Sequence, residues 1–446
     1  MSLLKFFYAK PAIPERDYTD KEFKSVRWKS FWAFTIGYAI YYVCRLSFSV
    51  AKPALVKEGI LTPTELGVIG SAVFITYAVG KFVNSAVSDY SNVTRYLSAG
   101  LFISALCNFA MGMNTSGIAL TIIWGINGWF QSMGVGACVV ALSRWYDEKE
   151  RGTYYGIWAT AHNIGEGITF VATATIVSYF GWRAGFELAG IIGLLGMLAM
   201  MKWVKDSPAS MGFRPIIKME TNSVELDKKE VLKHQWDVVK NPAIWILAIG
   251  CCCMYVARYG VTGWGVFFLE NGKGYTTVEA AGIIGINSII GIFSTMASGW
   301  LSDRFLGGNR SLMVVIVSLI NTVALACFLF APAGNHWFTL IAMSVFGFSL
   351  GIQLCFFGGL LATDISHKAA SGMAMAMMGV FSYAGAALGE FLTGVMIDKT
   401  STVVEGKTIY NFDSLSYFWI GADFLSAVAG VLLMIIVARQ AKKSTV

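Results

Sequence analysis

The sequence predicts an all-α membrane protein with twelve transmembrane helices in two pseudo-symmetric six-helix halves. Its composition is the first reason, because 56% of the 446 residues are hydrophobic and 14% are charged, whereas soluble proteins carry about 25% charged residues. Second, apolar stretches long enough to cross ~30 Å of hydrocarbon recur along the chain. Third, sequence blocks of the first half return, in the same order, in the second half.

Each apolar stretch of about 20 residues predicts one membrane-spanning helix. The expected spans cover residues 30–50, 64–87, 97–113, 117–142, 155–180, 184–201, 243–268, 280–301, 311–332, 337–362, 371–396 and 416–438. Residues 1–29 are charged and lack a cleavable apolar region, so we expect a soluble tail. The remaining predicted divisions are a bundle at 30–204, a linker at 205–240, a second bundle at 241–438 and a tail at 439–446.

The placement of lysine and arginine predicts the orientation. Most of these residues fall on the side of the two predicted tails, which the positive-inside rule assigns to the cytoplasm. The opposite side carries only Lys52, Lys57, Arg183, Lys273, Lys399 and Lys407. We therefore interpret the net charge of +7 as a consequence of topology, not of nucleic-acid binding.

The sequence gives no sign of enzyme chemistry. A nucleophile with its base and a GxxxxGK[ST] phosphate loop are both missing from it. The three cysteines at 251–253 point in different directions on a helix, which does not suit a metal site. All eight cysteines fall inside expected spans, where they act as small apolar residues. We expect no enzyme activity, no cofactor and no metal.

Two arginines occupy equivalent places in the two halves: Arg45 ends YYVCR, and Arg258 ends MYVAR. An arginine at the bilayer centre costs at least ~2.5 kcal/mol. Two guanidinium groups that approach a shared axis need an anion, and their fork geometry suits a phosphate dianion. The alternative is that each pairs with a buried carboxylate, for which the candidates are Glu166, Glu390 and Asp423.

Other polar side chains in the spans are candidate ligands of a phosphate ester. Lys81 could be a third cation in the cavity, or it could extend to the lipid headgroups. His162, the one histidine deep in an expected span, could bond the phosphate or be an ordinary core residue. Tyrosines near the cations could donate hydrogen bonds or form packing and interfacial belts; they are Tyr38, Tyr41, Tyr42, Tyr77, Tyr255 and Tyr383.

Two aspartates are candidate gating residues. Asp89 in SAVSDYSNVTR and Asp303 in SGWLSDRFLGGNR both follow the second span of a half. An acid near basic residues and a helix terminus could latch one conformation. A solvated loop is the alternative.

Six blocks resemble the organophosphate:phosphate antiporter family of the major facilitator superfamily: GYAIYYVCR, LGVIGSAVFITYAVGKFVNSAVSDYSN, GWFQSMG, the run from Glu150 to Asn163, RYGVTGW and GWLSDRFLGGNR. This family includes glycerol-3-phosphate and hexose-6-phosphate transporters and a hexose-phosphate sensor. The resemblance implies that Arg45 and Arg258 bind phosphate, that Lys81 is the cavity lysine and that His162 binds substrate. It also implies a cavity lined by Tyr38, Tyr42, Tyr77, Trp158, Tyr255 and Tyr383.

Some blocks depart from the family pattern. GWFQSMGVGAC lacks the WPP of several relatives, and YAGAALGE lacks the Asp and Lys pair of the hexose-phosphate transporter. Glu166 stands where small residues are usual, and a carboxylate that accepts bonds from sugar hydroxyls favours glucose 6-phosphate. These departures concern substrate selectivity.

The expected function is exchange of a sugar phosphate for inorganic phosphate by alternating access, in a bacterial inner membrane with both termini cytoplasmic. The alternatives are a glycerol-3-phosphate or phosphoglycerate antiporter, a non-transporting hexose-phosphate sensor and an anion channel. We expect the organophosphate, inorganic phosphate and the lipid bilayer as partners, no nucleic acid, and a monomer.

Overall fold

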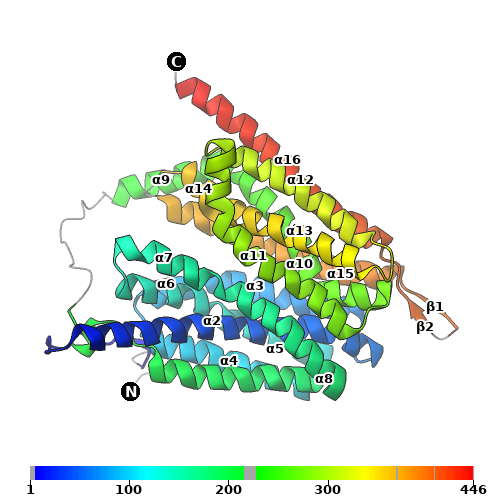
Figure 1. Cartoon of the computed structure of the whole chain (residues 1–446), viewed down its shortest axis with the longest axis horizontal. Coiled ribbons are helices and arrows are strands. Elements are labelled where there is room, and N and C mark those ends of the chain that lie inside the picture. The colour runs from blue at the N-terminus through cyan, green and yellow to red at the C-terminus, as the bar shows by residue number, and fades with distance from the viewer. Residues whose placement is uncertain (1–5, 215–227, 368–369, 406, 445–446) are drawn as a thin grey trace. The chain divides into compact units, whose positions relative to one another are not determined.

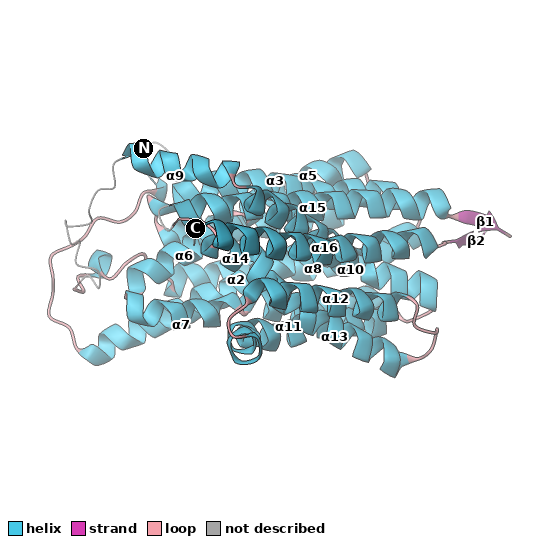
Figure 2. Cartoon of the chain, turned by 90° about the horizontal axis from the view of Figure 1, so that it is seen from above, coloured by secondary structure: helices cyan, strands magenta, loops and turns pink. Residues whose placement is uncertain are grey.

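The computed structural model describes residues 6–214, 228–367, 370–405 and 407–444, and nearly all of them are helical (Figure 2). The chain contacts divide it into two compact units. The first contains Met1–Ala51 and Ile75–Ser223, and the second contains Lys52–Phe74 and Val224–Val446. The boundary near residue 223 lies in the predicted linker, whereas residues 52–74 pack with the second unit although they belong to the first half of the sequence.

The two helices α2 (Asp20–Lys57) and α3 (Pro63–Asp89) contribute to both units. The first unit also contains α4 (Val93–Met113), α5 (Gly117–Gln131), α6 (Met133–Trp145), α7 (Glu148–Ala159), α8 (Ala161–Trp203) and the short 3-10 helix η1 (Ala209–Met211). Within it, α4 lies along α8 and also packs on α5 and α6 (Figure 1). The side chain of Asn92 caps the N-terminus of α4, because its carboxamide oxygen accepts a hydrogen bond from the Arg95 amide.

The second unit contains α9 (Lys228–Lys240), α10 (Pro242–Lys273), α11 (Thr277–Leu306), α12 (Arg310–Leu329), α13 (His336–Cys355), the π-helical turn η2 (Phe356–Leu360), α14 (Leu361–Asp364), α15 (Ser371–Thr400) and α16 (Asp413–Ser444). Strands β1 (Thr402–Val404) and β2 (Lys407–Ile409) pair antiparallel, with Thr402 opposite Ile409. Helix α10 packs on α15 and α16, and α13 packs on α11 and α12. The Asn309 side chain caps the N-terminus of α12 in the same way, by accepting a hydrogen bond from the Leu312 amide.

Ten helices of the described chain are long and apolar enough to cross a membrane. One of them, Lys149–Trp203, has 55 residues, more than twice the ~20 that one crossing needs. Its backbone breaks at Gly181, where φ is 82°, an angle that glycine adopts readily. Helices α5 and α6 are each short, but Ser132 between them keeps right-handed helical angles. The long helix therefore makes two crossings, and α5 and α6 together make one more. Added to the other nine long helices, these give the twelve predicted spans.

Some predicted boundaries differ from the structure. Helix α2 begins at Asp20, not near residue 30, because a helix can extend beyond the apolar part that marks its crossing. Part of the predicted linker is helical, since α9 covers Lys228–Lys240, while residues 215–227 of that linker lie outside the described residues. All eight cysteines are free thiols within helices, in agreement with their predicted packing role.

Candidate functional site

In the first unit, Arg45 lies against two tyrosine rings. Tyr38, Tyr42 and Arg45 lie four and three residues apart on α2, a spacing that places them on one helix face. Arg45 is buried, with only 5% of the residue exposed. Its guanidinium carbon lies 4.2 Å from the centre of the Tyr77 ring and 5.1 Å from that of Tyr42. At these distances the ring faces attract the cation.

The same cluster extends to α7 and α8. The Tyr42 ring centre lies 5.7 Å from that of His162, and the Tyr38 ring centre lies 4.9 Å from that of Trp158. Tyr38 and Tyr42 also contact each other, at 5.7 Å. The structure therefore brings together six of the predicted site residues, from helices α2, α3, α7 and α8.

The second unit repeats this arrangement around Arg258, which is 7% exposed on α10. Its guanidinium carbon lies 5.5 Å from the ring centre of Tyr255 and 5.2 Å from that of Tyr259. The Tyr383 ring on α15 lies 6.2 Å from that of Tyr255. Tyr259, which the sequence reasoning did not select, thus completes the pair of rings. It follows Arg258 directly, whereas the predicted tyrosines of the two arginine motifs all precede the arginine.

A buried ion pair lies elsewhere in the second unit. Lys52 Nζ is 2.6 Å from Glu390 Oε2, with side-chain exposures of 0% and 4%. The Trp264 indole donates to the same oxygen at 2.7 Å, and Lys52 Nζ lies 4.0 Å from the centre of that indole ring. A β-carbon on Gly70 would lie 2.6 Å from Glu390 Oε2, so this small residue makes room for the carboxylate.

This pair corrects the assignment of Lys52. The sequence placed it at the membrane surface, but it is fully buried in α2 and bound to a carboxylate. A lysine one turn beyond an apolar run has the same neighbours in the sequence whether it reaches the membrane surface or is buried in the protein. The partner, Glu390, lies in a distant part of the sequence, and no local signal connects the two.

Two of the three carboxylates that could have neutralised an arginine are engaged by other side chains. Glu390 binds Lys52 and Trp264. Asp423, which is fully buried on α16, accepts bonds from Asn321 Nδ2 at 3.0 Å and Thr322 Oγ1 at 2.8 Å. The third, Glu166, is 3% exposed on α8. Glu390 and Asp423 therefore accept these hydrogen bonds from side chains other than the two arginines.

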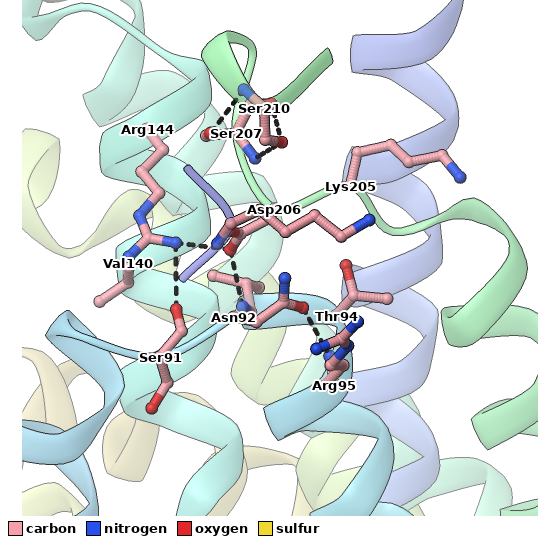
Figure 3. A network of polar contacts seen from close by, with 12 residues as sticks. Ser91, Asn92, Thr94, Arg95, Val140, Arg144, Lys205, Asp206, Ser207 and Ser210 are labelled. Carbon is pink, nitrogen blue, oxygen red and sulfur yellow. Dashed lines mark hydrogen bonds and ion pairs between the residues drawn. The ribbon is translucent and has the colours of Figure 1, made fainter. Parts of the chain in front are cut away.

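The remaining candidates are Lys81, Asp89 and Asp303. Lys81 is half-buried on α3, one turn after Tyr77. Asp89 and Asp303 are exposed. Arg144 donates to the backbone carbonyl of Asp89 at 3.0 Å, but its carboxylate partner is Asp206, at 2.6 Å (Figure 3). The gating role of the two aspartates stays a prediction. Among the residues that the structure describes, no group of three or more His, Cys, Asp and Glu side chains is placed to hold a metal ion.

Comparisons with known proteins agree with this architecture. The sequence model of the Major Facilitator Superfamily matches residues 34–390. A "Probable hexose phosphate transport protein" of Chlamydia pneumoniae is 34% identical, over 86% of this chain and 88% of the relative. The "Membrane sensor protein UhpC" of Salmonella typhimurium is 30% identical over 87% and 89%, and the "Glycerol-3-phosphate transporter" of Bacillus subtilis is 33% identical over 89% and 92%.

Solved structures share the fold at low identity. A bacterial homologue of the human lysosomal transporter Spinster, in an inward-facing and unoccupied conformation, superposes with a TM-score of 0.72 at 18% identity, over 93% of this chain and 95% of that one. The nucleoside transporter NupG gives a TM-score of 0.70 at 13% identity, over 91% of this chain and 98% of that one.

Proposed function

Because this chain belongs to the Major Facilitator Superfamily and, within it, to the organophosphate:phosphate antiporter group, we propose that it exchanges a sugar phosphate for inorganic phosphate across a bacterial inner membrane. It is a multi-pass membrane transport protein of the organophosphate group. The observation that carries the finer proposal is the repeated motif of a buried arginine in contact with two tyrosine rings, at Arg45 and at Arg258.

Electrostatics explains why such a carrier would exchange one anion for another. Each arginine keeps its charge at all physiological pH values, because its side chain does not lose a proton in proteins. A phosphate ester carries about two negative charges at neutral pH, since its second pKa is about 6. Each of the two arginines, which hold equivalent places in the repeat, offers a guanidinium fork that suits a phosphate group. Without an anion the buried positive charges are costly to enclose, so only a loaded carrier changes conformation.

The organic part of the substrate is the finer question. Glu166 could accept hydrogen bonds from sugar hydroxyls, which favours a polyol such as glucose 6-phosphate over a smaller ester. The hexose-phosphate name of the Chlamydia relative supports the same choice. The concentration of lysine and arginine on the side of the tails supports a topology with both termini in the cytoplasm.

Phosphate-loaded proteoliposomes test the substrate directly. They would be challenged in parallel with labelled glucose 6-phosphate, glycerol 3-phosphate and phosphoglycerate. We expect the fastest uptake for glucose 6-phosphate, coupled to phosphate efflux and absent from vesicles without internal phosphate. Faster uptake of either smaller ester would contradict the choice of sugar phosphate, and phosphate efflux without any external substrate would contradict exchange.

A sensor is the second candidate, because one relative with 30% identity is named a membrane sensor. The same site residues would then bind a hexose phosphate, and the protein would signal to a partner without transport. Purified protein that binds glucose 6-phosphate in vesicles, but exchanges neither it nor phosphate, would favour the sensor over the transporter.

A further inference from the structure

The first unit has a cavity whose lining residues are not those of its aromatic cluster. It has a volume of about 640 Å³ and lies beside the first turns of α4, the last turns of α8, the segment after α8 and the tail before α2. The side chains that line it are basic at one end and apolar at the other. This division suggests a ligand with a charged part and a hydrocarbon part.

The apolar end is formed by membrane-spanning helices. On α4, Ser98 and Phe102 follow Arg95 by three and seven residues, so all three lie on one face. Across from them, α8 contributes Met197 and Met201. Phe102 is 38% exposed and Met201 is 57% exposed, although both belong to apolar spans. The cavity is therefore continuous with surface that faces lipid in a membrane.

The other end carries three basic side chains, those of Lys10, Arg95 and Lys205. One carboxylate, that of Asp206, also lines the cavity. Its charge is already bound, because it accepts from Arg144 at 2.6 Å and from the Val93 and Lys10 amides at 2.8 Å (Figure 3). The excess charge in the cavity is positive.

Two of the residues that line the cavity each have a buried polar atom without a hydrogen-bond partner within the described part of the chain. The atoms are Asn92 Nδ2 and Ser98 Oγ, in residues that are 0% and 3% exposed. The orientation of the Asn92 carboxamide is fixed, since its Oδ1 accepts from the Arg95 amide at 3.0 Å. Its NH₂ group therefore points away from the helix cap, on the side of Asp206 and Lys205 (Figure 3). A buried donor without an acceptor costs about 1–3 kcal/mol.

We propose that this cavity binds the phosphate headgroup of an anionic phospholipid from the leaflet at the tail side of the protein. Asn92 Nδ2 and Ser98 Oγ donate to the phosphate, and Arg95, Lys10 and Lys205 surround its charge. One acyl chain then covers Phe102 and Met201. A free phosphate would satisfy the donors but leave the apolar end uncovered, which is why the lipid is the better occupant. The site is independent of the proposed transport function.

Arg95 is placed to take part without losing its present contacts. One guanidinium nitrogen donates to the Phe6 carbonyl at 2.8 Å, and the guanidinium carbon lies 4.5 Å from the Phe6 ring centre. A guanidinium has five N–H donors, so a headgroup can use others. The N-terminus of α4 adds a favourable dipole for an anion.

The test compares two substitutions with a matched control. Asn92→Asp keeps the oxygen that caps α4 but replaces the free NH₂ with a negative oxygen. Ser98→Leu fills the cavity with hydrocarbon. Asn309→Asp makes the same chemical change at the cap of α12, where the side chain accepts from the Leu312 amide at 3.1 Å. Purified full-length variants would be titrated with phosphatidylglycerol and, separately, phosphatidylcholine, and bound lipid would be counted by native mass spectrometry.

We expect the unmodified protein and Asn309→Asp to bind phosphatidylglycerol equally and to prefer it to phosphatidylcholine. Asn92→Asp and Ser98→Leu should each bind it at least about tenfold more weakly, as expected for loss of a bond to a charged group. Equal binding by all four proteins would overturn the proposal. Equal loss in Asn309→Asp, no preference for the anionic lipid, or displacement of the lipid by excess inorganic phosphate would also overturn it.

Discussion

Lys52 and Glu390 form an ion pair of 2.6 Å that is almost completely shielded from solvent. Removing one partner leaves the other charged and buried, which costs about 3–5 kcal/mol, whereas an apolar replacement of both is often neutral. We therefore expect Lys52→Met and Glu390→Met to lower the free energy of unfolding by this amount. The double variant should be more stable than either single one.

Denaturation of the purified variants, followed by circular dichroism, measures these differences. Unchanged stability of both single variants would show that the two charges are not held together in the folded protein. A double variant that is less stable than the single ones would show that the pair contributes more than its mutual neutralisation.

Asp206 anchors the tail in front of α2. Its carboxylate binds Arg144 and accepts from the Lys10 amide at 2.8 Å. Asp206→Ala should release this segment and cost about 1–3 kcal/mol of stability, because charged hydrogen bonds are lost. Limited trypsin digestion would then cleave faster after Arg16, whereas the Lys10–Pro11 bond resists trypsin in every variant.

Asp364→Ala is the matched control for that experiment, because Arg310 and Asp364 form an ion pair of the same 2.6 Å length in the second unit. It should leave cleavage after Arg16 unchanged. Slow cleavage in Asp206→Ala, at the rate of the unmodified protein, would contradict the anchoring role.

The ring of Tyr77 contacts Arg45 through its face, with 4.2 Å between the guanidinium carbon and the ring centre. Tyr77→Phe keeps that face, whereas Tyr77→Leu removes it. A cation–π contact contributes about 0.5–2 kcal/mol, so Tyr77→Leu should bind glucose 6-phosphate a few-fold to about thirtyfold more weakly. Tyr77→Phe should bind glucose 6-phosphate with an affinity within about threefold of the unmodified protein, because it keeps the ring face that contacts Arg45.

Equilibrium binding of labelled glucose 6-phosphate to purified protein separates the two variants. Equal loss in both would show that the phenol hydroxyl, not the ring face, matters for binding. Equal retention in both would show that Tyr77 does not hold Arg45 in its binding orientation.

The sequence could predict the number of spans and the two arginines for specific physical reasons. Long apolar runs mark crossings because the backbone must satisfy its own hydrogen bonds in lipid. Arg45 and Arg258 stand out because a charge inside such a run is costly and because both occur in the same motif. Tyr38, Tyr42, Tyr77 and His162 were candidates because they are polar groups near the cations of the spans, and the family resemblance added Trp158.

Other features depend on contacts between distant parts of the chain. Nothing near Lys52 indicates that Glu390 and Trp264 would enclose it, since the three residues come from α2, α15 and α10. Asp206 was seen only as part of the break after the sixth span, and its bond to Arg144 joins the ends of two helices. Hydropathy marks the crossing of α2 but not its polar extension back to Asp20.

Counterflow by the variants Arg45→Lys and Arg258→Lys tests the central claim most directly. Lysine keeps the charge but loses the bidentate fork that suits phosphate. In proteoliposomes with matched amounts of folded protein, we expect each variant to lose most of its exchange of labelled glucose 6-phosphate for internal phosphate, while Lys399→Gln on the predicted outer side keeps it. Exchange at the unmodified rate in both arginine variants would contradict the account.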